Sequence, residues 1–165
     1  LPCRKVAFSE KNPIKHKELE NMCDEIAKGH EEYEPASYAY QMDYAERSHG
    51  YTMGSSPYST LTLNYDFRTA SHIDKGDLIN SRSTLTILEE IPNNYSGCYL
   101  GFPEYKIALD LRDGDTLIFD AHEYHCNTEM KVLTDKLPID ELTGASHGGR
   151  ISIVAYLRNR MIDCN

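Results

Sequence analysis

The segment RISIVAYLR, at residues 150–158, places isoleucine, isoleucine, alanine and leucine at every second position. Side chains alternate between the two faces of a β-strand, so this period of two predicts a strand with one buried face. The same pattern recurs, between turn signals, in five earlier segments: STLTLNYDF (59–67), STLTILEEI (83–91), GCYLGF (97–102), YKIALDL (105–111) and DTLIFDA (115–121). Because no crossover-helix pattern separates them, they exclude a doubly wound α/β fold and favour a sandwich, barrel or jelly roll.

The first third of the chain has a different pattern. Residues 14–28 (IKHKELENMCDEIAK) carry apolar side chains at spacings of three and four, which predicts an amphipathic helix. Asn12-Pro13 is its start signal and Gly29 its stop signal. Residues 30–57 contain five tyrosines and a Gly/Ser turn, and they are predicted to form a loop or short irregular structure that covers the core.

These patterns predict a single domain of mainly β structure. We expect a helical and loop segment at residues 1–58 that packs on a β core at residues 59–165. A chain of 165 residues is long enough to bury a core without disulfide bonds. Residues 131–149 are polar and end in glycine, so a long loop is expected between the last two strands.

Composition excludes several classes of protein. No apolar run approaches the roughly 20 residues of a membrane-spanning helix, so we expect no membrane segment. The first residues show neither a signal peptide nor a starting methionine, so we expect a longer parent protein. The five cysteines are odd in number and lack a C-x-x-C spacing, which favours reduced thiols in an intracellular protein. A net charge of −9 argues against unaided, nonspecific binding of nucleic acid.

Two histidines and an aspartate could form a metal site. His72 and Asp74 are two residues apart at a strand end, where both side chains point to one face; alone, the pair also fits a surface histidine beside a turn aspartate. The later segment GDTLIFDAHEYH supplies a further histidine, either His122 or His125. Two histidines and one carboxylate on one face of a metal are the ligands of non-heme iron(II) oxygenases.

Arg150, at the start of the last strand segment, could bind a cosubstrate. Its rigid guanidinium matches a carboxylate with two parallel hydrogen bonds. It could therefore hold the far carboxylate of a 2-oxoglutarate whose other end chelates the iron. The alternative is a solvated charge at a sheet edge.

The order of these motifs resembles the 2-oxoglutarate/iron(II)-dependent dioxygenases. H-x-D is followed by GDxLxFDxHxxH-x-N and then by R-x-S on the last strand. The segments FRTASHIDKGDL, YSGCYLGFPEYKIALDLRDGDTLIFDAHEYHCNT and RISIVAYLR look like the TET/J-binding-protein group, which oxidises the 5-methyl group of pyrimidines in DNA. The similarity runs from about residue 59 to 164, and it implies a double-stranded β-helix (jelly-roll) core.

The resemblance assigns roles to individual residues. His72, Asp74 and His125 match the iron ligands, because the family's distal histidine directly precedes a small residue, Asn and Thr, as His125 does here. His122 then lies at the rim of the site. Arg150 and Ser152 match the residues that bind the 2-oxoglutarate carboxylate.

Other residues match positions near the target base. Asp77 matches an acidic residue at the polar edge of the base, where a carboxylate could accept from the cytosine N4 amine; its alternative role is in a turn. Tyr156 matches a stacking aromatic residue or packs in the core. Arg158 lies where some relatives have a histidine facing the base, and Arg68 could hydrogen-bond near the site. The chain departs from the family at Gly97-Cys98, where relatives often have Gly-Gly, and in its longer span between His125 and Arg150.

The resemblance implies hydroxylation of a DNA base, with Fe(II), 2-oxoglutarate and O2. Conversion of 5-methylcytosine to 5-hydroxymethylcytosine is the first expectation and conversion of thymine to 5-hydroxymethyluracil the second. A hydroxylase of a protein or small molecule is a further alternative, and a cupin-like binding module without turnover is another. No obligate protein partner is evident, and the nucleus, or the host cytoplasm for a viral or bacterial protein, is the expected location.

Overall fold

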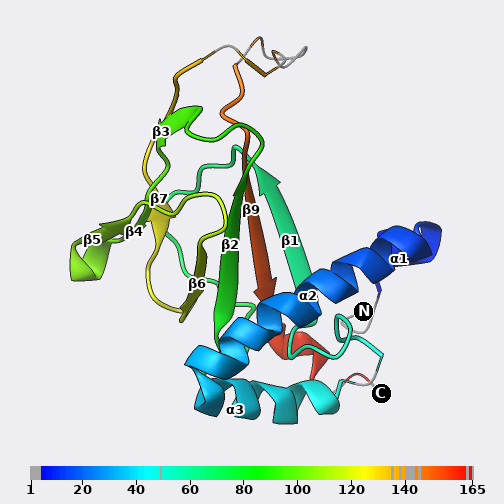
Figure 1. The fold of residues 1–165 in the computed structure, drawn as a ribbon. Helices are drawn as coiled ribbons and strands as arrows, with labels where there is room; N and C mark the ends of the chain where they lie inside the picture. Colours follow the sequence, from blue (N-terminus) through cyan, green and yellow to red (C-terminus); the bar gives the residue numbers. More distant parts are fainter. Residues whose placement is uncertain are drawn as a thin grey trace.

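The computed structural model describes residues 5–48, 50–134, 136–137, 139, 144, 146–162 and 164. Helices come first, and the strands follow them along the chain (Figure 1). The helices are α1 (Ala7–Lys11), α2 (Pro13–Tyr33) and α3 (Pro35–Glu46), with short 3-10 turns at Pro103–Tyr105 and Asn159–Met161. The strands are β1 (Thr60–Tyr65), β2 (Ser83–Glu89), β3 (Tyr95–Gly97), β4 (Leu100–Phe102), β5 (Ile107–Leu109), β6 (Thr116–Phe119), β7 (Cys126–Asn127), β8 (Met130–Val132) and β9 (Arg150–Tyr156).

The strands form a large sheet and two small ones. The large sheet has the antiparallel order β1-β9-β2-β6, while β3 pairs with β8 and β4 lies between β5 and β7. Each of the six segments with a period of two contains a strand, which confirms those predictions, and the core is a jelly roll. The very short strands β3, β7 and β8 were not predicted, and β8 takes the first residues of the expected loop at 131–149; residues 135, 138, 140–143 and 145 of that loop lie outside the described part of the chain.

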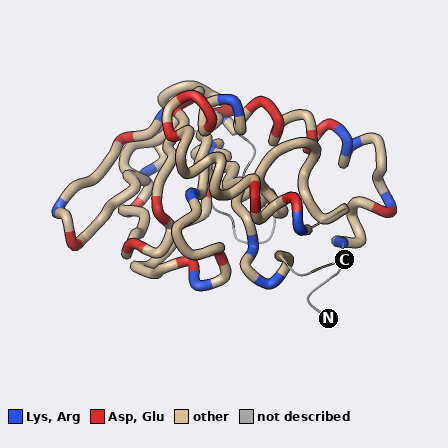
Figure 2. Tube along the Cα trace, turned by 90° about the horizontal axis from the view of Figure 1, so that it is seen from below, with Lys and Arg blue, Asp and Glu red and all other residues tan. Residues whose placement is uncertain are grey.

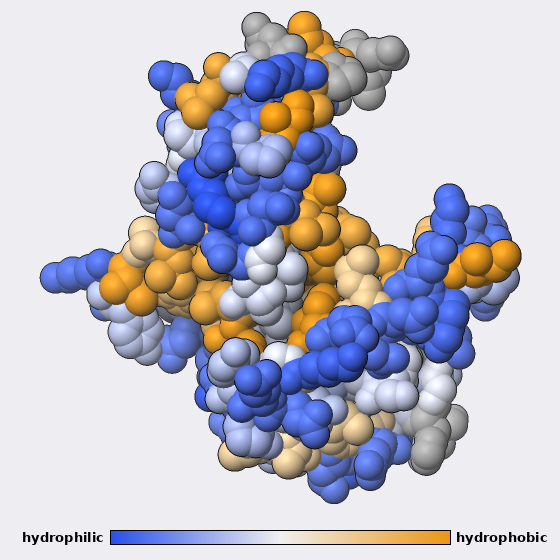
Figure 3. Space-filling view, in the orientation of Figure 1, coloured by the Kyte–Doolittle hydropathy of each residue, from blue (hydrophilic) through white to orange (hydrophobic). Residues whose placement is uncertain are grey.

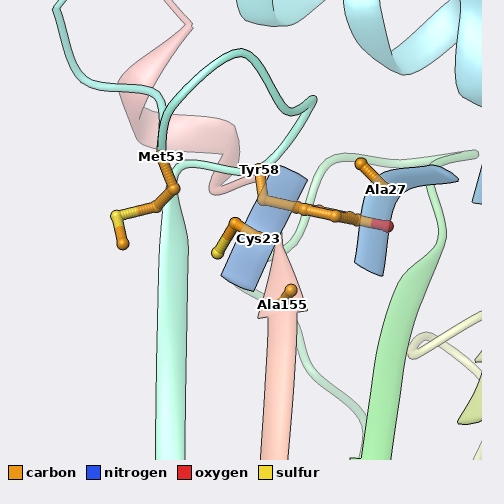
Figure 4. Packing of buried hydrophobic residues seen from close by; sticks show 5 residues of the cluster. All are labelled: Cys23, Ala27, Met53, Tyr58 and Ala155. Atoms are coloured by element: carbon orange, nitrogen blue, oxygen red, sulfur yellow. The ribbon is translucent and has the colours of Figure 1, made fainter. Parts of the chain in front are cut away.

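Neighbouring residues of β9 face opposite layers of the domain. Ala155 packs against Cys23 and Ala27 of α2, and Figure 4 shows the Tyr58 ring reaching past Cys23 toward Ala27. Val154, on the other face, joins the apolar cluster around Leu100 of β4. The large sheet therefore lies between the helices and the small sheets. The boundary between residues 58 and 59 stays a prediction.

The prediction of a loop at 30–57 is wrong for its first half. Helix α2 continues through Gly29 to Tyr33, and α3 follows after Pro35. Glu34 separates them in a non-helical conformation (φ −133°, ψ 60°), because a residue before proline disfavours the α region. Sequence periodicity missed this region because its buried helical positions include the polar residues His30 and Gln41.

A chain of hydrogen bonds joins the helices to the large sheet. The His30 ring nitrogens lie 3.1 Å from the Tyr58 hydroxyl and 2.8 Å from Ser37 Oγ. The Tyr58 hydroxyl lies 2.7 Å from Thr84 Oγ1 of β2. His30, Tyr58 and Thr84 are fully buried, so each hydrogen bond replaces one that water would otherwise make.

Acid is expected to weaken the fold through His30. Burial is the largest cause that lowers the pKa of His30 from 6.5 to about 4, so the folded protein holds the ring neutral. Below pH 6.5 the unfolded chain binds a proton that the folded chain does not, and stability falls with pH; at pH 5 the loss from this residue is about 2 kcal/mol. Urea unfolding at pH 7.5 and pH 5 should show a smaller difference for His30→Gln than for the wild type. An equal pH dependence in both proteins would contradict this assignment.

A hollow lies on the helix-covered side of the large sheet, outside the jelly-roll interior. It has a volume of about 410 Å³ and is lined by Phe8 of α1, Leu19 of α2, and Leu61 and Leu63 of β1. Figure 3 shows hydrophobic residues exposed between the helices and the sheet on this face.

Within the described residues, none of the helices is both long enough and apolar enough to cross a membrane.

The described cysteines differ in state. Cys23, Cys98 and Cys126 are free thiols. Cys164 is disulfide-bonded, so the expectation of reduced thiols is wrong for this residue. Burial raises the pKa of Cys23 to about 12 and also raises the pKa of Cys98, which keeps both thiols protonated and unreactive at neutral pH.

Candidate metal and cosubstrate site

Two segments distant in sequence bring three candidate ligands together. His72 and His125 form an isolated antiparallel bridge, in which each backbone N–H donates to the other's carbonyl oxygen at 3.0 Å. Asp74 Oδ1 lies 3.5 Å from His72 Nε2, and Asp74 Oδ2 lies 3.7 Å from His125 Nε2. One ligand atom from each residue lies within 4.8 Å of the others, so the group could hold a metal ion.

Hydrogen bonds orient both imidazole rings toward that position. His72 Nδ1 lies 2.8 Å from the carbonyl oxygen of Ala70, and His125 Nδ1 lies 2.8 Å from that of Glu123. A carbonyl oxygen can only accept, so each Nδ1 carries a proton, which leaves Nε2 as the atom of each ring that can offer a lone pair to a metal at the shared position. Metal-binding histidines are commonly fixed in this way by their second nitrogen.

His122 lies outside this group. Its Nδ1 is 3.4 Å from Asp120 Oδ1, and the same carboxylate oxygen accepts from the His122 backbone N–H at 2.9 Å. Among the described residues, the metal-binding group contains His125 and not His122. The geometry therefore favours His125 of the two candidates that the sequence left open.

The candidate ligands open into a cavity of about 390 Å³ inside the jelly roll. Strand β9 lines it through alternate residues, namely Arg150, Ser152, Val154 and Tyr156, followed by Arg158. This alternation follows from the period of two in the strand. The cavity thus contains the three candidate ligands and both residues predicted to bind 2-oxoglutarate.

Arg150 is buried and its guanidinium is not fully hydrogen-bonded. The residue is 2% exposed, and its Nε has no hydrogen-bond partner. No carboxylate of the described residues forms an ion pair with the guanidinium. A buried, unsatisfied donor costs about 1–3 kcal/mol, and more for a charged group, so the site suits an anionic ligand that supplies the missing acceptors. Ser152 is also buried, one strand repeat further along. These residues fit the carboxylate of 2-oxoglutarate.

Asp77, Tyr156 and Arg158 also line the cavity. Asp77 is 5% exposed, and its Oδ2 accepts from Ser83 Oγ at 2.6 Å; burial raises the pKa of its carboxyl to about 6. Asp77 and Arg158 form an antiparallel backbone bridge. The Tyr156 hydroxyl lies 3.4 Å from Thr62 Oγ1.

The prediction that Arg68 lies near the site is not supported by its position. Phe67 and Thr69 line the cavity, while Arg68 between them is exposed and does not. Sequence reasoning also missed Thr62 and Asn64, whose alternation with Leu61 and Leu63 was the available signal for a polar, cavity-facing side of β1.

The charge around the cavity is mixed. The exposed residues Lys75 and Arg158 line it together with the acidic Asp74 and Asp77. Figure 2 shows Lys and Arg interspersed with Asp and Glu along the described chain. Binding of a polyanion would therefore depend on a few local basic residues and not on a broad positive field.

Comparison with known proteins identifies the class and then the family. The fold and the His-Asp-His group with a buried arginine are those of a 2-oxoglutarate- and iron(II)-dependent dioxygenase domain. The chain belongs to the Tet/JBP family, described as the oxygenase domain of the 2OGFeDO superfamily, whose model matches residues 1–159.

Relatives of known name include trypanosomatid proteins. The chain is 32% identical over 160 residues to "Bifunctional helicase and thymine dioxygenase JBP2" of Leishmania braziliensis, which covers 97% of the chain and 13% of that protein. It is 34% identical over 134 residues to "Thymine dioxygenase JBP1" of Trypanosoma brucei brucei, which covers 79% of the chain and 15% of that protein. The chain thus spans a small part of these relatives' length.

A solved structure confirms the fold. The structure described as "NgTET1 in complex with 5mC DNA" aligns with a TM-score of 0.66 and 16% sequence identity. The alignment covers 98% of this chain and 58% of the other. It includes the N-terminal helices, which the sequence resemblance did not reach.

Proposed function

We propose that this domain hydroxylates the 5-methyl group of a pyrimidine base in DNA, and that the base is 5-methylcytosine. The observation that carries the proposal is the shared cavity, which holds the candidate metal ligands together with the buried, incompletely hydrogen-bonded guanidinium of Arg150. The names of the matched dioxygenases and of the DNA-bound structure support a base in DNA as the substrate.

In this proposal, His72, Asp74 and His125 bind Fe(II), and Arg150 and Ser152 bind the far carboxylate of 2-oxoglutarate. When bound, iron and 2-oxoglutarate would supply the oxidation: 2-oxoglutarate loses carbon dioxide and takes one oxygen atom of O2 to become succinate, and the other oxygen atom enters the C–H bond of the methyl group to give a hydroxymethyl group. The residues of this chain contribute by fixing the ligands in one tautomer, by orienting the cosubstrate and by enclosing the reacting methyl group.

The base must leave the double helix to reach the ligands. A 5-methyl group in duplex DNA lies among stacked bases, so enzymes that modify bases flip the nucleotide into a pocket. Tyr156 offers a ring for stacking, and Lys75 and Arg158 are exposed cations that could contact phosphate at the opening. These contacts would give a strongly salt-dependent affinity despite the net negative charge.

Asp77 supports 5-methylcytosine as the base. An ionised carboxylate only accepts hydrogen bonds, and cytosine presents an N4 amine where thymine presents the O4 acceptor. Ser83 already donates to Asp77 Oδ2, which leaves further acceptor capacity on the carboxylate. The names of the matched relatives support thymine as the second candidate base.

Two other functions have less support. A hydroxylase of a protein or small molecule would share the same iron and cosubstrate residues, and the net charge of −9 is the observation that favours it. A cupin-like binding module without turnover would have no need for Arg150 and Ser152 beside the metal ligands.

Mass spectrometry of nucleosides tests the proposal. The protein is reconstituted with Fe(II) and 2-oxoglutarate without oxygen and then exposed to air with methylated or unmethylated DNA. Hydroxymethylcytosine from methylated DNA alone is expected. Hydroxymethyluracil would assign thymine, succinate release without an oxidised base would exclude both DNA bases, and no succinate in any reaction would overturn the dioxygenase activity.

Asp77→Asn is expected to weaken the choice between the two bases. The amide can turn its NH2 group toward thymine O4, so the ratio of 5-methylcytosine to thymine oxidation should fall by about tenfold or more. The measurement is competition between the two bases in one oligonucleotide. Asp113→Asn, in an exposed turn, is the matched control and should keep the wild-type ratio. An unchanged ratio in Asp77→Asn would remove Asp77 from base recognition.

A further inference from the structure

Asp66 forms hydrogen bonds with both the backbone N–H and the backbone carbonyl oxygen of Arg150. The Arg150 N–H donates to Asp66 Oδ1 at 2.8 Å, and the Asp66 N–H donates to the Arg150 carbonyl oxygen at 2.8 Å. These contacts continue the β1–β9 pairing by one residue beyond the Tyr65–Ile151 pair. Arg150 is therefore fixed to the end of β1 through its main chain.

The same carboxylate also accepts hydrogen bonds from residues that precede Arg150. Its Oδ2 accepts from the N–H groups of Gly148 at 2.8 Å and Gly149 at 3.3 Å, and lies 3.2 Å from His147 Nδ1. Three consecutive backbone N–H groups thus converge on one side chain, in the kind of concave arrangement that binds anions. The Asp66 side chain is only 11% exposed, which protects these hydrogen bonds from competing water.

We call the hydrogen bonds between Asp66 and residues 148–150 the Asp66 clamp. Two of its residues have a backbone conformation that is rare for most amino acids. Asp66 has φ 49° and Gly149 has φ 77°, both in the left-handed region. A Cβ on Gly148 would lie 2.8 Å from Met130 Sδ and 3.3 Å from Asp66 Oδ1, so a side chain there would crowd the clamp. Aspartate tolerates the left-handed region better than most residues, because its short side chain hydrogen-bonds locally.

We infer that Asp66 is a positioning residue for 2-oxoglutarate binding, acting through the backbone of Arg150. The inference rests on the proposed role of Arg150. The Arg150 side chain is long and buried, and its Nε has no partner in the protein, so its direction depends on how its own backbone is anchored. Asp66 supplies both backbone hydrogen bonds of Arg150 on the β1 side, while Glu89 of β2 pairs with Arg150 on the other side, and Asp66 does not itself line the cavity.

Two variants separate the contributions of Asp66, and a third variant at another residue is the control. Asp66→Asn keeps the size and the tolerance of positive φ but replaces one acceptor oxygen with a donor that opposes the backbone N–H groups. Asp66→Gly keeps the backbone conformation and removes every side-chain acceptor. The matched control is Asp115→Asn, whose carboxylate accepts from the Arg112 N–H at 2.8 Å in the exposed turn between β5 and β6.

The test is calorimetric titration of 2-oxoglutarate into the Fe(II)-loaded protein without oxygen, together with amide hydrogen exchange of residues 148–150. We expect the Kd for 2-oxoglutarate to rise about tenfold in Asp66→Asn and further in Asp66→Gly, with faster exchange at these amides and unchanged Fe(II) affinity. Asp115→Asn should match the wild type in Kd. If Asp66→Asn does not fold, Asp66→Glu, which keeps the charge but displaces it by one methylene, takes the same measurement.

The outcomes distinguish this inference from the proposed function. A wild-type protein that binds Fe(II) but no 2-oxoglutarate would overturn the cosubstrate role of Arg150. Wild-type binding of 2-oxoglutarate with an unchanged Kd in the Asp66 variants, whatever their melting temperature, would show that Asp66 is only a structural anchor. That result would overturn the inference and leave the dioxygenase proposal intact.

Discussion

His125→Ala is expected to abolish Fe(II) binding and hydroxylation, whereas His122→Ala is expected to keep both. Loss of a residue that merely orients a ligand costs about 10–100-fold in metal affinity or activity, so loss of a ligand should cost at least about 100-fold. His125 Nε2 faces Asp74, while His122 Nδ1 lies beside Asp120. The two histidines belong to the same short segment, so they form a matched pair for this comparison.

Both variants can be measured by anaerobic Fe(II) titration and by nucleoside mass spectrometry. The backbone bridge between His72 and His125 uses no side-chain atom, so His125→Ala should preserve it and the fold. A circular dichroism spectrum like that of the wild type is the control. Loss of iron in His122→Ala with retention in His125→Ala would reverse the assignment.

The sequence predicted the strands well because side chains that alternate between the two faces of a sheet leave a period of two in the pattern of residues. In β9, for example, Ile153 and Ala155 are buried on the helix-covered side, and Arg150 and Ser152 are buried on the cavity side. Helix α3 was missed because its sequence lacks a stripe of apolar residues at helical spacing: buried Gln41 is held by hydrogen bonds to Pro57 and Arg82, which lie far along the chain. Periodicity cannot detect a buried position that is polar.

The residues of the candidate site also divide into those that the sequence predicts and those that it does not. His72, Asp74 and Arg150 are recognisable because their residue types imply a chemistry at a given spacing. The role of Arg68 stays a prediction, since residue type alone does not give the side of the chain on which a side chain lies. Asp66 was missed because its partners are backbone N–H groups, which leave no trace in the pattern of side chains.

Arg150→Met is expected to lose 2-oxoglutarate binding while making the ligand-free protein at least as stable as the wild type. The guanidinium is buried and its Nε is unsatisfied, which costs about 1–3 kcal/mol or more in the ligand-free fold. Methionine has a similar length and no polar group to desolvate. Replacing a buried polar group by an apolar one of similar shape is often neutral or stabilising.

Arg150→Lys tests whether 2-oxoglutarate binding needs the shape of the guanidinium or only its positive charge. Lysine keeps the positive charge but presents a single ammonium group, which cannot form two parallel hydrogen bonds with a carboxylate. We expect its Kd for 2-oxoglutarate to rise by about tenfold or more, since each 1.4 kcal/mol lost is a factor of ten. Melting temperatures with and without 2-oxoglutarate check both variants: the ligand should raise the wild-type value, raise that of Arg150→Lys less, and leave that of Arg150→Met unchanged. A ligand-free Arg150→Met protein that melts well below the wild type would mean that the guanidinium stabilises the fold itself, and its burial would then no longer point to a missing anionic ligand.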